Sequence, residues 1–266
     1  IDKARVVADR IVAADGQAAP HVADVQSEWM MRALADNVVK ADGRIDIWVN
    51  AAGVFLPSPV GDTPPEVLNG MIDINLKGSW NAIQAVVPHM KAAGGGKILN
   101  FSSVAGLTAI KGFALYCASK AATAMLTRVL GAELAPFNIN VNAIAPGNTE
   151  TPMNDAMRND PAQSAVLAAM KAMTPSNQTF SKPDEIASTA LFLVSDEARP
   201  MYGSILLADE ACPPRSADRS RGRALILRHP HPGRRAADPS RRTAWGCKPR
   251  LRGSHHLLQE YFSCRL

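Results

Sequence analysis

Three side chains suited to proton transfer occur within residues 100–120. Tyr116 and Lys120 are four residues apart at the predicted start of a long helix, so both lie on one helical face. Ser103 lies thirteen residues before Tyr116, after an apolar run at residues 97–101 that predicts a strand. A nearby cation stabilises a phenolate, whose pKa is otherwise about 10. We therefore expect Lys120 to lower the pKa of Tyr116, Tyr116 to exchange a proton with a substrate oxygen, and Ser103 to donate a hydrogen bond to that oxygen.

This Ser…Tyr-x-x-x-Lys set resembles the core of the classical short-chain dehydrogenases/reductases. The resemblance implies an oxidoreductase that uses NAD or NADP and interconverts a ketone and a secondary alcohol by hydride transfer. It also implies a homo-tetramer or dimer, and within the enzymes a 3-oxoacyl thioester reductase is a possible sub-class. A catalytically silent binding or regulatory module is the alternative from another functional class.

Other segments extend the resemblance. Asn75, in M-I-D-I-N-L-K-G, matches the helix Asn that holds a water behind the catalytic Lys in the family, although a locally satisfied Asn that bends a helix would look the same. Residues 50–53, Asn-Ala-Ala-Gly, resemble the Asn-Asn-Ala-Gly turn, with Ala51 replacing the second Asn; an ordinary strand-to-loop turn is equally compatible. Residues 146–151 resemble the loop that clasps the nicotinamide. The implied cofactor-binding residues are Asp24, Asn50, Ala51, Gly53, Tyr116, Lys120, Pro146, Gly147, Thr149 and Thr151.

Predicted strands and helices alternate along the chain. Helical periods occur at residues 1–14, 29–41, 113–135 and 183–194, and strand patterns at residues 21–25, 45–49, 97–101, 138–144 and 203–209. Such alternation is typical of a parallel sheet covered on both faces, so the predicted fold class is α/β, a Rossmann-like doubly wound parallel sheet. The sheet would bring Asp24, at the end of its strand, towards the adenine.

The family's first βαβ portion, with its glycine-rich turn, has no counterpart in these residues. Ile1-Asp2 matches relatives just after their second strand. We therefore expect a fold without that portion, in which the strand at residues 21–24 and the strand at residues 45–49 leave a gap or pair directly. The residue that would select NAD or NADP lies in the absent portion.

The composition divides the chain into a domain that resembles short-chain dehydrogenases/reductases, residues 1–211, and a tail, residues 212–266. The tail carries 13 Lys+Arg and 3 Asp+Glu, against 16 and 21 in the domain. Its Arg-, Pro- and Ser-rich sequence predicts disorder and suggests a shifted reading frame or a fusion, with a basic nucleic-acid-binding arm as the less favoured alternative. No long apolar run or signal peptide is present, so we expect a cytoplasmic protein without membrane association. The four cysteines lack metal-ligand spacing, and no metal site is predicted.

Two apolar patterns could serve assembly or substrate binding. A stripe on the predicted helix 113–135 could mediate subunit association or belong to the core of one chain; it comprises Ala118, Ala121, Ala122, Met125 and Val129. The Met-rich residues 154–173 occupy the place of the substrate lid in relatives, where an apolar, pliable surface would suit a hydrophobic ketone or alcohol.

Overall fold

A parallel sheet forms the centre of the fold. The computed structural model describes residues 2–172 and 174–211, all within the first of two units, residues 1–221 and 222–266. Its strands lie side by side in the order β1-β2-β3-β4 and all pair in parallel. Their bounds are β1 (Ile47–Asn50), β2 (Gly96–Phe101), β3 (Ile139–Pro146) and β4 (Ile205–Ala208).

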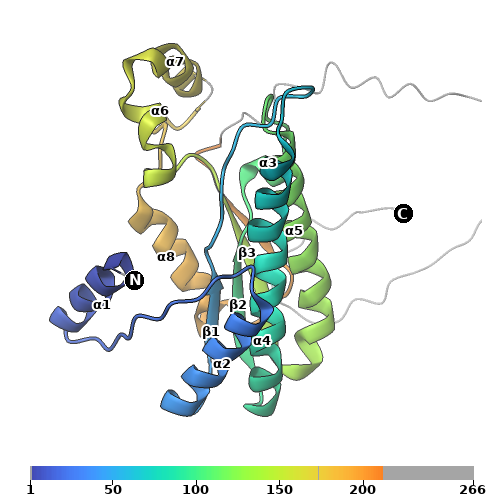
Figure 1. Ribbon diagram of the computed structural model, residues 1–266. Coiled ribbons are helices and arrows are strands. Elements are labelled where there is room, and N and C mark those ends of the chain that lie inside the picture. The colour runs from blue at the N-terminus through green and yellow to red at the C-terminus, as the bar shows by residue number, and fades with distance from the viewer. Residues whose placement is uncertain (1, 173, 212–266) are drawn as a thin grey trace, which may run out of the picture. The chain divides into compact units, whose positions relative to one another are not determined.

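Helices precede and connect these strands (Figure 1). A π-helical segment, Met71–Gly78, runs directly from α3 into α4, so the helical backbone is continuous through all three. The helices are α1 (Asp2–Ala13), α2 (Glu28–Asp42), α3 (Pro65–Gly70), α4 (Ser79–Ala92), α5 (Ala114–Leu134), α6 (Asp155–Asn159), α7 (Ser164–Ala172) and α8 (Pro183–Val194).

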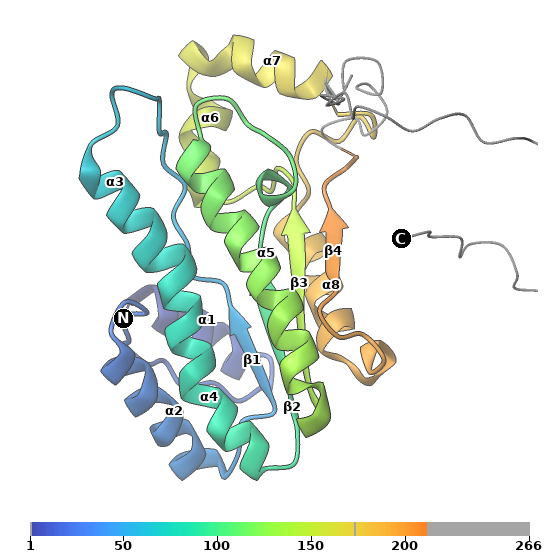
Figure 2. The same ribbon diagram turned by 90° about the vertical axis from the view of Figure 1, so that its right-hand side faces the viewer.

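The sheet is covered on both faces. Figure 2 shows α4 and α5 in front of the strands and α8 behind them. Successive strand residues point to opposite faces, and accordingly Ile98 joins the buried cluster that contains α2, α4 and α5 residues while Leu99 joins the cluster under α8. The predicted α/β Rossmann-like parallel sheet is therefore confirmed.

Local sequence signals fix the position of α2 beside α4. The side chain of Ser27 accepts a hydrogen bond from Met30 N at the start of α2, and Gly43 ends it in a left-handed conformation with φ 85°. Met31 and Ala35 on α2 are buried in the same apolar cluster as α4 residues. This packing determines where the segment before α2 lies.

One predicted strand is absent. Residues 21–25 have no strand conformation, although their pattern resembles a strand, because no strand among the described residues pairs with them. The segment instead turns at Val25 and Gln26 into α2. The strand predicted at residues 21–25 is therefore wrong, and so is direct pairing with β1, one of the two arrangements expected for it. The predicted tail at residues 212–266 lies outside the described residues.

Within the described part of the chain, no helix combines the length and apolarity needed to cross a bilayer.

Candidate active site

The carboxyl end of β2 brings the predicted catalytic residues together. Ser102 and Ser103 follow the strand directly and are buried, and Ser103 caps a short 3-10 turn by accepting a hydrogen bond from Ala105 N at 3.1 Å. Ser102 Oγ donates to the backbone carbonyl of Lys120 at 2.8 Å, and Lys120 Nζ donates to the carbonyl of Phe101, also at 2.8 Å. These two bonds, made in opposite directions, fasten α5 to the end of the strand.

Tyr116 lies one turn before Lys120 on α5 and is half-buried. The side chain of Ser103 lies close enough to the phenol to lower its pKa, so two of the three predicted groups are neighbours. The ring of Phe55 packs edge-on against the Tyr116 ring, with centroids 4.7 Å apart, and stacks on Phe113 at 4.4 Å. Apolar rings therefore form one wall beside the phenol.

Burial dominates the ionisation of both groups. Burial raises the pKa of Tyr116, the hydrogen bond from Ser103 opposes the rise, and Cys117 adds to it. Burial also lowers the pKa of Lys120, to about 8. Lys120 Nζ lies 5.8 Å from the centroid of the Tyr116 ring. At that separation, and with its own charge disfavoured, Lys120 does not offset the burial of the phenol. The expected net lowering of the Tyr116 pKa is therefore not found in the free chain.

Asn75 lies in the π-helical segment and is 1% exposed. Its Oδ1 accepts a hydrogen bond from Val54 N at 2.8 Å, and its Nδ2 donates to Val54 O and to Ser119 Oγ, both at 3.0 Å. These contacts join the loop after β1 to α5, so Asn75 makes long-range bonds in addition to one local contact, to Met71 Sδ at 3.7 Å. π-helical turns occur frequently at functional sites.

Asn50 makes its side-chain contacts inside the sheet. Its Nδ2 donates to Asn100 Oδ1 at 2.8 Å, its Oδ1 accepts from Trp48 Nε1 at 2.7 Å, and Asn100 in turn donates to Thr127 Oγ1 on α5 at 3.0 Å. Sequence reasoning gave no role to Asn100 or Thr127. A polar residue in an otherwise apolar strand was the available signal for Asn100, because buried amides require partners.

The loop after β3 is held by backbone hydrogen bonds to neighbouring segments and by the side chain of Asn154. Gly147 N donates to Ala208 O at 2.9 Å, and Thr149 pairs with Ser181 in an isolated bridge. Asn154 Nδ2 donates to the carbonyl of Thr149 at 2.7 Å, and Thr151 N donates to Asn154 Oδ1 at 3.2 Å. Because β2 and β3 are parallel neighbours, this loop leaves the sheet at Pro146 on the same edge as Ser103.

Comparisons with known proteins agree with this geometry. The family model described as "Enoyl-(Acyl carrier protein) reductase" matches residues 2–210. The 3-oxoacyl-[acyl-carrier-protein] reductase FabG of Thermotoga maritima is 36% identical over 194 residues, 73% of this chain and 76% of the relative. An NAD-dependent glycerol dehydrogenase of Listeria innocua is 38% identical over 70% of this chain and 71% of its own length. A gluconate 5-dehydrogenase from Burkholderia cenocepacia, solved with NADP and tartrate, superimposes with a TM-score of 0.73 at 35% identity, covering 79% of this chain and 81% of the other.

The chain belongs to the short-chain dehydrogenase/reductase family. Its activity class is that of an NAD(P)-dependent oxidoreductase that interconverts alcohols and carbonyl compounds. Among the described residues, no group of His, Cys, Asp and Glu could hold a metal ion.

The edge of the sheet in this short-chain dehydrogenase/reductase fits a dinucleotide. An added Cβ at Gly53 would stand 3.2 Å from Asn75 Oδ1 and 3.5 Å from Lys120 Nζ, so the glycine lets the backbone after β1 lie close to the buried ammonium. An ammonium has three donors, and the bond to Phe101 O uses one of those of Lys120. Ligands bind α/β sheets at this carboxyl edge.

Asp24 is separate from the catalytic group. It is exposed in the turn before α2 and is hydrogen-bonded to Gln26 and Ser27. Ala51 is exposed directly after β1 and Gly53 is half-buried. The structure thus brings Asn75, Ser103, Tyr116 and Lys120 around one point and leaves Asp24 on another part of the surface.

Proposed function

We propose that Ser103, Tyr116 and Lys120 are the catalytic set of a reductase/dehydrogenase for apolar ketones and secondary alcohols. The observation that carries this proposal is the placement of the Ser103 side chain beside the Tyr116 phenol, next to a buried Lys120, at the carboxyl end of β2. The groups come from a strand end and a helix, both rigid elements, so their relative positions are fixed before substrate arrives.

The residues divide the chemistry between them. In reduction, the Tyr116 hydroxyl donates its proton to the substrate oxygen as negative charge develops there; in oxidation, the phenolate accepts the proton of the alcohol. Ser103 Oγ donates a hydrogen bond to the same oxygen. Bound NAD(P) supplies the hydride to the substrate carbon, or accepts it. Lys120 offers its remaining donors to ribose hydroxyls, and Asn75 keeps the loop at Gly53 in place through Val54.

The wall beside Tyr116 favours an apolar substrate. Phe55 and Phe113 present stacked rings next to the phenol. Met153 in the segment that follows the β3 loop is 54% exposed, and an exposed thioether there suits a pliable apolar cover. Relatives include a glycerol dehydrogenase, a cyclopentanol dehydrogenase and a 3-oxoacyl-[acyl-carrier-protein] reductase. A substrate panel must therefore span these three substrate classes.

We assign the remaining cofactor contacts to the edge of the sheet and to the turn before α2. The backbone at Asn50, Ala51 and Gly53 and the loop with Pro146, Gly147, Thr149 and Thr151 would hold the nicotinamide half. The Asp24 carboxylate would accept a hydrogen bond from the exocyclic amino group of the adenine. The separation of Asp24 from Tyr116 is consistent with binding opposite ends of an extended ligand.

We also propose that two chains associate through α5. Of the predicted apolar stripe, Ala118, Ala121, Met125 and Val129 are exposed in the single chain and Ala122 is half-buried, so the stripe does not belong to its core. Exposed Trp80 on α4 adds to the apolar surface of this helix layer. Small and apolar residues on a helix face allow close packing with a second copy.

The test is turnover of NADH and NADPH on apolar ketones and a 3-oxoacyl thioester, and of NAD+ and NADP+ on glycerol and apolar secondary alcohols, with Tyr116→Phe beside Tyr202→Phe. The two substitutions remove the same hydroxyl, at the site and elsewhere. We expect Tyr116→Phe to lower kcat by at least about a hundredfold and Tyr202→Phe to leave it unchanged. If the wild-type chain binds cofactor but turns over nothing, or if Tyr116→Phe turns over normally, the catalytic proposal fails and a silent binding module takes its place.

A further inference from the structure

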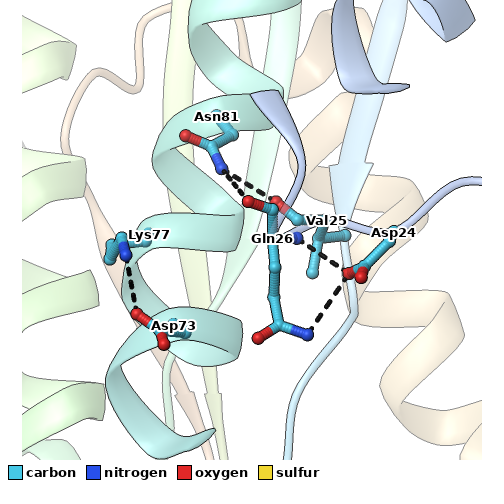
Figure 3. Close-up of polar contacts among 6 residues, drawn as sticks. All are labelled: Asp24, Val25, Gln26, Asp73, Lys77 and Asn81. Atoms are coloured by element: carbon cyan, nitrogen blue, oxygen red, sulfur yellow. Dashed lines mark hydrogen bonds and ion pairs between the residues drawn. The ribbon is translucent and has the colours of Figure 1, made fainter. Parts of the chain in front are cut away.

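The turn that carries Asp24 is tied to helix α4 by one side chain. Asn81 Nδ2 donates hydrogen bonds to two successive backbone carbonyls, Val25 O at 2.9 Å and Gln26 O at 3.3 Å (Figure 3). The partners are 56 and 55 residues apart in sequence. A primary amide has two N–H donors, so this side chain can serve both carbonyls at once and thereby fix the orientation of two consecutive peptide groups.

A second contact, one turn earlier on the same helical backbone, supports the first. A Cβ added at Gly78 would stand 2.6 Å from Val25 Cγ2 and 2.9 Å from Val25 Cβ. The absence of a side chain at Gly78 therefore lets Val25 rest directly on the helix. Gly78 determines how close the turn approaches, and Asn81 determines its orientation.

The turn at residues 24–26 also orients the Asp24 carboxylate. Asp24 Oδ1 accepts hydrogen bonds from Gln26 N at 2.9 Å and from Gln26 Nε2 at 3.4 Å, and Asp24 O accepts from Ser27 N at 3.0 Å. Both Gln26 groups bind the same carboxylate oxygen, as Figure 3 shows. The direction of Asp24 thus depends on the peptide group that joins Val25 to Gln26: its N–H binds the Asp24 carboxylate, and its carbonyl, Val25 O, accepts from Asn81.

We infer that Asn81 is a positioning residue for the adenine-binding end of the cofactor site. It acts through the turn at residues 24–26, which packs against the helix at Gly78. The inference rests on the proposed assignment of Asp24 to the adenine amino group. An exposed turn without this anchor would sample several orientations, and binding would then have to order it at a cost in affinity. The contribution falls on ground-state binding of the adenosine half and leaves the chemical step at Tyr116 untouched.

Lys77 provides a matched control. It lies on the same helical backbone, and its Nζ pairs with Asp73 Oδ1 at 2.7 Å within one turn, without contact to the turn before α2 (Figure 3). Lys77→Ala therefore changes the same stretch of helix without touching the Asp24 turn. Asn81→Asp is a second test variant, because it places a carboxylate against two carbonyl oxygens.

The experiment measures the Kd of AMP and of nicotinamide mononucleotide separately, together with amide hydrogen exchange at Gln26, in the full chain. In Asn81→Ala we expect AMP to bind about fivefold to tenfold more weakly, with nicotinamide mononucleotide unchanged and faster exchange at Gln26. Asn81→Asp should weaken AMP further, and Lys77→Ala should match wild type. In turnover, the KM for the cofactor should rise, while kcat should stay within about twofold of the wild-type value.

The outcomes separate this inference from the proposed function. AMP affinity within about twofold of wild type in Asn81→Ala, or an equal loss for both mononucleotides, overturns the positioning role. If wild type binds no AMP, the adenine assignment of Asp24 and this inference both fail, while the Tyr116 comparison still decides the catalytic proposal. If wild type binds AMP but turns over no ketone, the catalytic proposal fails and the AMP comparison still decides the role of Asn81.

Discussion

Lys120 lowers the stability of the fold at neutral pH. Its side chain is buried, being 7% exposed, and burial lowers its pKa from 10.5 to about 8. Each pKa unit corresponds to about 1.4 kcal/mol, so holding this ammonium in the folded chain costs about 3 kcal/mol at pH 7. Between pH 8 and pH 10.5 the unfolded chain keeps a proton that the folded chain has released, and the free energy of unfolding therefore rises with pH over this window.

The substitution that exposes this cost is Lys120→Met, which keeps the length of the side chain and removes its charge. It also removes the bond to Phe101 O, a loss that does not depend on pH. We expect the unfolding free energy of wild type, relative to that of Lys120→Met, to increase by about 2 kcal/mol between pH 7 and pH 9.5. The difference between the variants cancels the titration of groups that they share.

The assay is urea unfolding at pH 7, 8.5 and 9.5, with Lys77→Met as the control. Lys77 is exposed, with 61% of its side chain accessible, so Lys77→Met removes an ammonium that folding does not bury. A gap between wild type and Lys120→Met that changes by less than about 0.5 kcal/mol over this range would refute the reasoning. It would mean that the ammonium is solvated in the folded chain, and the proposed use of its free donors towards ribose would lose its basis in burial.

Three further predictions concern the same site. Because burial raises the pKa of Tyr116, carbonyl reduction should be fast at neutral pH and alcohol oxidation should still be rising at pH 9.5, as pH–rate profiles in both directions would show; an oxidation rate that is flat above pH 7 would contradict this. Asn75→Ala leaves Val54 N without its side-chain acceptor and should lower the unfolding free energy by about 3 kcal/mol, measured by urea unfolding, whereas a loss below about 1 kcal/mol would disprove the anchoring role. Gly147→Ala places a Cβ 2.7 Å from Asp209 Cα, so it should force the ends of β3 and β4 apart, lowering Tm and raising the cofactor KM; an unchanged Tm would count against this close approach.

The placement of Tyr116 and Lys120 on one face could be predicted from sequence because it depends on local geometry. Tyr116 and Lys120 lie on one face of α5 through their four-residue spacing alone. The strand that precedes Ser103 could also be predicted from the sequence, since a short apolar run bounded by polar residues specifies it. The segment at residues 21–25 shows the limit of such patterns: its alternation is typical of a strand, but strand conformation needs a neighbour to take its hydrogen bonds, and the described chain provides none.

The contacts that hold the site together were not readable, because they depend on register between distant segments. Asn50 meets Asn100 only because these two residues are partners in the β1–β2 pairing, and nothing in either strand alone specifies that register. The same holds for the continuous helix through Met71–Gly78 and α4, which contacts the loop after β1 through Asn75 and the turn before α2 through Asn81. One helical backbone therefore sets the positions of both segments. A change that shifts this helix is expected to disturb the loop after β1 and the Asp24 turn together, whereas Asn81→Ala should disturb only the turn.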